Sequence, residues 1–131
     1  MEADSNNGSS QKSTNEIEQI RDQVLSHFHT HRTEYDLIFT SGTTAGAKLI
    51  GEYFAWTPQS RFAYHQHSVH NSILGIREYA TTHHASFEAV DSLTLDSGQL
   101  PSSTDPNLLA LPYQCNFSGQ RFPIQSWLAN L

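Results

Sequence analysis

The chain has 131 residues, a length typical of one domain at ~100–200 residues per domain, and 37% of them are hydrophobic. Its 13 acidic and 7 basic side chains give a net charge of −6, which disfavours non-specific binding to nucleic acid, because such binding needs Lys and Arg to neutralise phosphates. A single cysteine excludes an internal disulfide framework. The sequence shows neither the pattern of a signal peptide nor the ~20 consecutive apolar residues of a membrane span. We therefore expect a cytoplasmic protein without membrane contact.

The chain begins with a polar tail and a predicted helix. Residues 1–12 are small and polar, and we expect them to be disordered. The stretch "STNE" fits a capping box in which Ser13 and Glu16 each bond the other's amide. Apolar residues at helical spacing follow, which predicts a helix over about 14–28.

The next two elements are a strand and a second helix. "YDLIFT" (35–40) is short and apolar enough for a buried strand, and "TTAGAKLIGEYFAW" (43–56) has a helical pattern. Gly46 and Gly51 weaken this helix, which indicates close packing against a neighbour. The side chains expected to face inward are Leu49, Ile50, Tyr53 and Phe54.

The rest of the chain alternates between strands and helices. We expect strands over 61–65, 86–90 and 108–112, helices over 68–81 and from about Pro123, and a loop over 96–107. This order predicts an α/β domain over 13–131 with a mostly parallel sheet of four strands, flanked by helices. Ligands of such sheets bind beyond the carboxyl ends of the strands. The clusters "TSGTT", "HQHSVHN" and "YQCNFSG" each follow a predicted strand, so we expect them to meet at one edge.

The first cluster has the composition of a phosphate site. Amides at a helix N-terminus point outward, and the helix dipole places partial positive charge there. Gly42 lets the backbone approach a ligand closely, and the hydroxyls of Thr43 and Thr44 can donate to phosphate oxygens. The alternative is that Ser41 or Thr43 merely caps the helix. A nucleotide P-loop is excluded, because the glycine spacing is wrong and Leu49 follows Lys48 where a hydroxyl is required.

The second cluster contains several histidines. Two groups have a spacing that would allow a shared metal, namely His65 with His67, and His27 with His29 and His31. No cysteine or carboxylate stands at ligand spacing, so we expect no metal site and mostly solvated loop histidines. His70 differs, because it opens a predicted helix beside the phosphate site, where its ring can stack on an aromatic cofactor or move protons.

The third cluster supplies amides and the single thiol. Gln114 and Asn116 directly follow the last predicted strand, and their amides can bind a phenolate or hydroxyl oxygen. Cys115 alternates with them and is expected to point to the other face. We therefore interpret it as a buried structural thiol and not as a nucleophile.

Three motifs together resemble a known family. "IFTSGTTAGAKLIGEYFAW", "HNSILGIREYA" and "QCNFSGQRFPIQSW" are similar to the aminotransferase-like domain of molybdenum cofactor sulfurases, from about Ser13 to Trp127. That family belongs to the class V aminotransferases and cysteine desulfurases, which use pyridoxal 5′-phosphate. The resemblance implies a partial large domain of a fold-type I transferase, from a cytosolic homodimer. Its reaction would take sulfur from L-cysteine and pass it to the molybdenum cofactor.

The resemblance also assigns roles to single residues. It implies that Ser41, Gly42, Thr43 and Thr44 hold the cofactor phosphate. It further implies that His70 stacks on the pyridine ring and that Asn116 binds near the phenolic oxygen. No catalytic residue is assigned, since the family's Schiff-base lysine and acidic residue come after the asparagine motif, where this chain has no Lys, Asp or Glu.

The missing lysine leaves several alternatives open. The chain's own lysines, Lys12 and Lys48, match neither position, so we expect the chain alone to be inactive. Tyr113 also departs from the small residue expected before the asparagine motif. A truncated gene model, an incomplete transcript and a decayed copy all fit the sequence. The functional alternatives are part of another class V enzyme, such as a cysteine desulfurase, or a non-catalytic module that binds phosphate or a protein.

Overall fold

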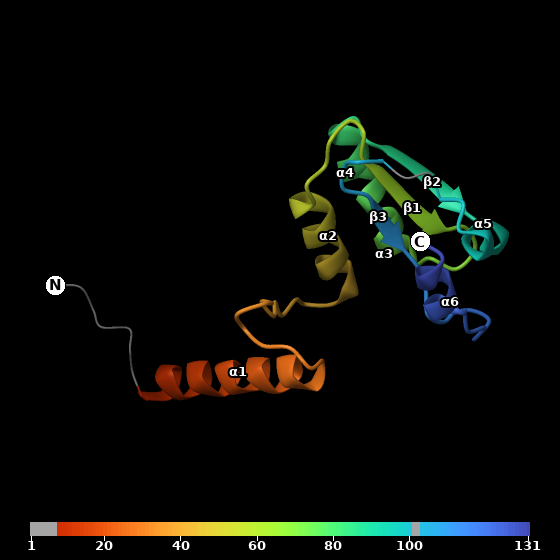
Figure 1. Cartoon of the computed structure of the whole chain (residues 1–131). Helices are drawn as coiled ribbons and strands as arrows, with labels where there is room; N and C mark the ends of the chain where they lie inside the picture. The colour runs from red at the N-terminus through yellow and green to blue at the C-terminus, as the bar shows by residue number, and fades with distance from the viewer. Residues whose placement is uncertain (1–7, 101–102) are drawn as a thin grey trace. The chain divides into compact units, whose positions relative to one another are not determined.

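The computed structural model describes residues 8–100 and 103–131. The chain divides into two compact units between Phe39 and Thr40. The first unit contains α1 (Gly8–His27) (Figure 1). Residues 8–12, expected to be disordered, are helical, and residues 1–7 of that prediction lie outside the described residues. The predicted capping box is wrong, because Ser13 lies inside the helix, where backbone amides bond to the preceding turn.

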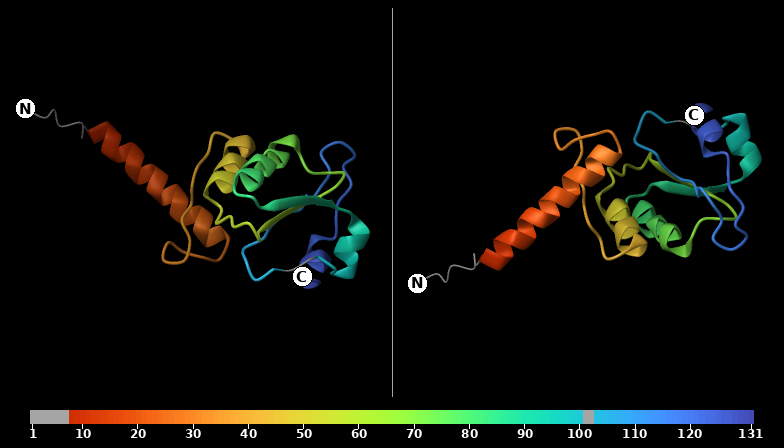
Figure 2. Two further views of the ribbon diagram at one scale, coloured as in Figure 1. Left: turned by 90° about the horizontal axis from the view of Figure 1, so that it is seen from above. Right: turned by 90° about the horizontal axis from the view of Figure 1, so that it is seen from below.

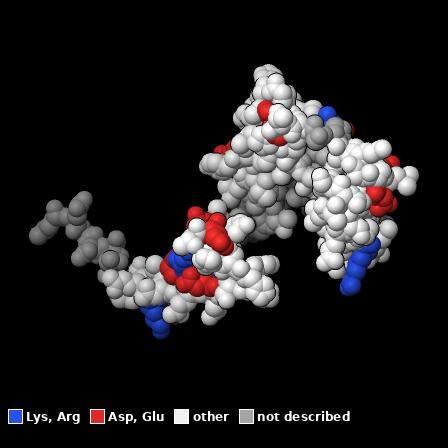
Figure 3. Space-filling model, viewed as in Figure 1, with Lys and Arg blue, Asp and Glu red and all other residues white. Residues whose placement is uncertain are grey.

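The segment after α1 corrects a second prediction. Residues 35–40 have no regular secondary structure, and the side chains of Tyr35 and Ile38 are exposed. The segment is held instead by Arg21, which donates to Leu37 O and lies 5.2 Å from the centroid of the Phe39 ring. Arg32 pairs with two acidic side chains of α1, Glu18 and Asp22. Figure 3 shows basic and acidic side chains adjoining on this unit.

The second unit is built on a parallel sheet. Within the described residues the sheet has three strands, β1 (Arg61–His65), β2 (Ser86–Val90) and β3 (Leu108–Ala110), in the order β2-β1-β3. Phe62 pairs with Phe87 of β2 and with Leu108 of β3. The expected parallel α/β architecture is confirmed, and β1 and β2 have the predicted bounds. The sheet has one strand fewer than predicted, since residues 35–40 do not join it.

Helices cover both faces of this sheet (Figure 2). Those on one face are α2 (Thr43–Tyr53), α3 (Asn71–Leu74) and α4 (Ile76–Thr82), and those on the other are α5 (Ser92–Ser97) and α6 (Ile124–Ala129). The predicted helix over 68–81 is divided at Gly75, which ends α3 and precedes α4. The start of the predicted loop is also corrected, because residues 96 and 97 belong to α5. The Asp91 carboxylate caps α5 by accepting from the Thr94 amide at 2.8 Å.

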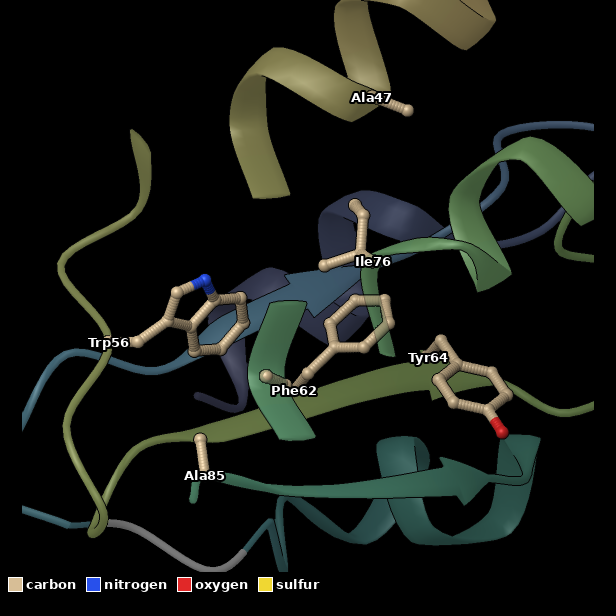
Figure 4. Close-up of a cluster of buried hydrophobic side chains, with 7 residues drawn as sticks. Ala47, Trp56, Phe62, Tyr64, Ile76 and Ala85 are labelled. Atoms are coloured by element: carbon tan, nitrogen blue, oxygen red, sulfur yellow. The ribbon is translucent and has the colours of Figure 1, made fainter. Parts of the chain in front are cut away.

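Alternate residues of β1 divide the core in two. Phe62 and Tyr64 point to the α2–α4 side, together with Ile76 and Trp56 (Figure 4). Ala63 points to the α5–α6 side, where Trp127 is 1% exposed. Burying a side chain of the size of Phe62 contributes ~1.5–3 kcal/mol, so these two layers fix the sheet and the loops that leave its strands.

The buried face of α2 differs from the prediction. Ala47 and Gly51 are buried, whereas Ile50 and Tyr53, expected to face inward, are 51% and 77% exposed. The expected close packing is confirmed at Gly51, where an added Cβ would lie 2.6 Å from Tyr79 Cδ2. Small residues on this face let α2 approach α4. Of the other side chains expected to face inward, Phe54 packs against the buried cluster and Leu49 is half-buried.

No helix in the described part of the chain combines the length and the apolar character that crossing a membrane requires.

Candidate functional site

The loop before α2 depends on a glycine. Gly42 has φ 150° and ψ 178°, a conformation that only glycine adopts without strain, and it is the N-cap residue of α2. Its carbonyl accepts from the Gly46 amide at 3.0 Å and from the Thr40 hydroxyl at 3.0 Å. No side chain of the described residues caps this helix, so the simple capping alternative for Ser41 and Thr43 is not what the structure shows.

His70 comes from the connector that follows β1. It is the N-cap of α3, and its Nδ1 accepts from the Ser72 amide at 3.2 Å. The Ser72 hydroxyl lies 3.0 Å from the same nitrogen and 2.7 Å from the Thr44 hydroxyl at the start of α2. The first turns of α2 and α3, which are far apart in the sequence, are therefore joined by a hydrogen bond at this point.

A pocket of about 300 Å³ lies where these loops meet the segment after β3. Its lining includes all six residues predicted from the sequence, namely Ser41, Gly42, Thr43, Thr44, His70 and Asn116. The expected meeting of the three polar clusters is confirmed. Two of them follow β1 and β3, parallel neighbours whose carboxyl ends share one edge, whereas the first follows no strand and reaches the pocket at the start of α2. Whether these residues bind a cofactor stays a prediction.

The lining of this pocket suits an anion. The amino end of α2 contributes partial positive charge, and four of the lining side chains are hydroxyls. Among the described residues that line it there is no carboxylate to repel an anion, and no lysine. Ser72 also lines the pocket, although it was not predicted from the sequence. Its position two residues after His70, in the first turn of a predicted helix, could have indicated that it belongs to the site.

An apolar groove adjoins this pocket. It has a volume of about 330 Å³ and includes Leu109, Leu111 and Pro112 from β3 and the segment that follows. His70 and Asn116 line both the pocket and the groove, and Gln114 lines only the groove. A ligand with a charged group on one side and a flat apolar ring on the other matches this pair of spaces.

Cys115 lies outside the pocket lining that the structure describes. It is half-buried and packs against the cluster of Ala63, Phe122 and Trp127, as expected for a residue that alternates with Asn116. However, hydrogen bonds from Ser118 lower the pKa of the Cys115 thiol to about 7. The thiol is thus partly ionised at neutral pH, which an inert structural thiol would not be.

Most of these histidines are exposed, as expected. His29, His31 and His67 lie in loops, whereas His27 ends α1 and His65, which ends β1, is 3% exposed. Its Nε2 lies 3.2 Å from the Ser92 hydroxyl, and burial lowers its pKa. The expectation of a solvated loop residue is therefore wrong for His65, because β1 continues to this position. No group of three potential metal ligands occurs among the described residues.

Fold and pocket together define an α/β protein with a polar pocket at the carboxyl ends of parallel strands. The chain is 40% identical to molybdenum cofactor sulfurase 1 of Aedes aegypti over 83% of its length, covering 14% of that relative. It is 40% identical to the molybdenum cofactor sulfurase of Arabidopsis thaliana over 81% of its length, and 36% identical to that of Homo sapiens over 95%. The chain covers 16% and 15% of these two proteins.

These similarities assign the chain to the molybdenum cofactor sulfurase family, as a segment that spans about a sixth of the length of the relatives it matches. No family model and no solved structure matches the chain.

Proposed function

We propose that this chain forms the phosphate-binding and ring-binding part of a pyridoxal 5′-phosphate site, in the large domain of a fold-type I, class V sulfurase. The observation that carries the proposal is the single pocket lined by Ser41–Thr44, His70 and Asn116. Membership of the molybdenum cofactor sulfurase family supports it independently, since the pocket comes from the geometry and the family from the sequence comparison.

The residues present fit the non-covalent part of this cofactor. The Ser41–Thr44 loop would hold the phosphate through hydroxyls and through the first amides of α2. His70 presents a flat ring between the polar pocket and the apolar groove, where the pyridine ring would lie. The Asn116 amide borders both spaces and would bind the phenolic oxygen. When bound, the cofactor supplies an electron sink that weakens bonds of an amino-acid substrate.

The parent protein would act on L-cysteine and the molybdenum cofactor. We infer that it takes sulfur from L-cysteine and transfers it to the molybdenum cofactor, as a cytoplasmic homodimer. The relatives are named molybdenum cofactor sulfurases, which supports the molybdenum cofactor as the acceptor of sulfur. The resemblance of the motifs to class V enzymes supports L-cysteine as the donor.

This chain by itself would bind without catalysing. Covalent anchoring of the cofactor needs a lysine amine beside the ring. Lys48 lines an adjoining groove formed by α2, α3 and α4, which shares Thr44 and Ser72 with the pocket, and Lys12 lies on α1. Neither lines the pocket of Ser41–Thr44, so we expect no release of sulfide from L-cysteine by the 131-residue chain.

Pyridoxine 5′-phosphate tests the binding proposal, because it carries the ring and phosphate but no aldehyde that could react with lysines. We expect titration calorimetry to show binding of this compound and much weaker binding of pyridoxine, which lacks the phosphate. The double variant Thr43→Val, Thr44→Val removes two hydroxyl donors, each worth ~0.5–1.5 kcal/mol, and should weaken binding at least about fivefold. Thr82→Val, an exposed hydroxyl change on α4, is the matched control. Equal affinity for pyridoxine and pyridoxine 5′-phosphate would contradict the proposal.

One further candidate is a non-catalytic phosphate-binding module, since the described lining of the pocket holds hydroxyls that suit a phosphate and no lysine. Such a module would bind inorganic phosphate as tightly as pyridoxine 5′-phosphate, because the apolar groove beside His70 would contribute nothing. Substitution of a lining residue of that groove, Leu111→Asp, then separates the two candidates. The variant should selectively weaken the binding of pyridoxine 5′-phosphate if the groove holds a ring.

Within class V, transfer of sulfur to the molybdenum cofactor by the parent protein distinguishes a sulfurase from a cysteine desulfurase.

A further inference from the structure

We infer that Ser72 is a positioning residue that couples the occupancy of the Ser41–Thr44 loop to the hydrogen bonding of His70. The inference rests on the proposed function in that it takes an anion as the ligand of this loop. Ser72 lies outside the Ser41–Thr44 loop and is not the histidine proposed to stack on the ring. Its proposed role is exerted through Thr44 of that loop and through His70.

The geometry places Ser72 between two groups of the site. Its hydroxyl is 2.7 Å from Thr44 Oγ1 and 3.0 Å from His70 Nδ1, and its amide donates to the same nitrogen at 3.2 Å. Ser72 is half-buried and lines the pocket, and its hydroxyl connects α3, to which it belongs, with Thr44 at the start of α2. Among the described residues, these bonds form a continuous chain from Thr44 to His70.

The amide of Ser72 fixes the tautomer of His70. A backbone N–H can only donate, so Nδ1 must accept and the proton of the neutral ring lies on Nε2. The other tautomer would bring the Nδ1 proton against the Ser72 amide proton. His70 therefore has a fixed donor, Nε2–H, on the side of the ring away from Ser72.

The hydroxyl of Ser72 has one hydrogen and two partners. In the first arrangement the Ser72 hydroxyl donates to His70 Nδ1 and accepts a hydrogen bond from the Thr44 hydroxyl. In the second arrangement the Ser72 hydroxyl donates to Thr44 Oγ1, and the Thr44 hydrogen points away from Ser72. An anion on the loop accepts the Thr44 hydrogen and so selects the second arrangement. The change consists of two hydroxyl rotations, with no proton transferred. Binding at Thr44 thereby removes one of the two hydrogen bonds to His70 Nδ1, and Ser72 transmits the change.

A double-mutant cycle read by NMR tests this coupling without any ligand. The 131-residue chain with ¹⁵N-labelled histidine is measured at about pH 8.5, where an ordinary imidazole, of pKa ~6.5, is neutral. His70→Gln assigns the resonances. We expect the ring to carry its proton on Nε2, and Thr44→Val to shift the Nδ1 resonance. In the Ser72→Ala background the same Thr44→Val change should lose its effect on Nδ1, and Ser72→Thr should restore it.

The controls separate this inference from the proposed function. Ser126→Ala, an exposed hydroxyl change on α6, should leave the His70 resonances unchanged. If Ser72→Ala does not fold, Ser72→Gly takes its place in the cycle, since it also removes the hydroxyl and keeps the amide that donates to His70 Nδ1. A Thr44→Val shift that persists undiminished in Ser72→Ala, or that is absent in the wild-type chain, overturns the inference.

Addition of inorganic phosphate then tests the ligand. In the wild-type chain the Thr44 amide and His70 Nδ1 resonances should shift with one midpoint, and Ser72→Ala should lose the Nδ1 shift while keeping the amide shift. If phosphate moves neither resonance, the proposed anion site fails, whereas the ligand-free cycle still decides the role of Ser72.

Discussion

The His65 imidazole stacks on the Trp127 indole, with ring centroids 5.5 Å apart and planes inclined by 21°. Phe122 lies on the same side of the sheet, with its ring centroid 4.8 Å from that of His65. His65 ends β1 and Trp127 belongs to α6, so this contact ties the carboxyl edge of the sheet to the last helix. The Nδ1 atom of His65 is buried and has no hydrogen-bond partner among the described residues.

This contact predicts a pH-dependent stability. Burial lowers the pKa of His65, and His67 lowers it further, while Asp91 opposes the shift. Below the unfolded pKa of ~6.5 the unfolded chain therefore binds more protons at this site than the folded chain. The free energy of unfolding should fall as the pH decreases from ~6.5 toward the lowered folded pKa, with a slope of at most ~1.4 kcal/mol per pH unit from this residue.

Urea unfolding at a series of pH values checks this prediction. His65→Phe keeps an aromatic ring in the stack and removes the titrating group, so its stability should depend less on pH over this window. Asp91 stays charged over the same range, because hydrogen bonds from Thr94 lower its pKa. His83→Gln, at an exposed position directly after α4, is the control and should change the slope less. Identical slopes for the wild-type chain and His65→Phe would contradict the prediction.

Gly51 should not tolerate alanine. An added Cβ would lie 2.6 Å from Tyr79 Cδ2 and 3.1 Å from Cγ, atoms near the base of a ring that cannot simply swing away. We expect Gly51→Ala to lower the free energy of unfolding by ~1–3 kcal/mol, the usual range for overpacking. Gly46→Ala on the same helix is the matched control. Its Cβ would meet only Thr40 Oγ1 at 3.6 Å, so the better helix propensity of alanine should leave stability unchanged or raised by up to ~1 kcal/mol.

Cys115 should react as a partly ionised thiol. The rate of alkylation by iodoacetamide should follow the thiolate fraction, with a midpoint near the pKa of about 7. The hydrogen bond from the Ser118 side chain is the largest cause of this low value, so Ser118→Ala should move the midpoint to higher pH. Ser97→Ala on α5 is the control. A midpoint near the ordinary cysteine value of ~8.5 in both chains would refute the prediction.

Trp127 should hold α6 to α5. Its indole Nε1 donates to Asp96 Oδ1 at 2.8 Å, and its side chain is 1% exposed. Trp127→Phe removes this bond and leaves space beside His65, so we expect a loss of ~1–3 kcal/mol in thermal or urea unfolding. Leu128→Ala, at a 57% exposed position of the same helix, should cost less. Equal losses in the two variants would show that the indole contact does not stabilise this face.

The sequence alone determined the elements whose pattern is local. The bounds of β1 and β2 follow from short apolar runs between polar turns, and the start of α2 follows from the glycine and hydroxyls before an apolar helix. The meeting of His70 and Asn116 at one pocket was also predictable, because they follow β1 and β3, parallel neighbours whose carboxyl ends share one edge. Thr43 follows no strand, and its place at the same pocket comes from α2.

Only the tertiary structure decided what depends on distant partners. Residues 35–40 have the composition of a strand, yet a strand requires a neighbour to complete its hydrogen bonds, and these residues pair with none of the three described strands. The inward face of α2 is set by its contact with Tyr79, which favours Gly51 over Ile50. The burial of His65 likewise depends on Trp127 of α6, and the bridging position of Ser72 depends on Thr44 of α2. The residues that flank His65 and Ser72 in the sequence do not specify these contacts.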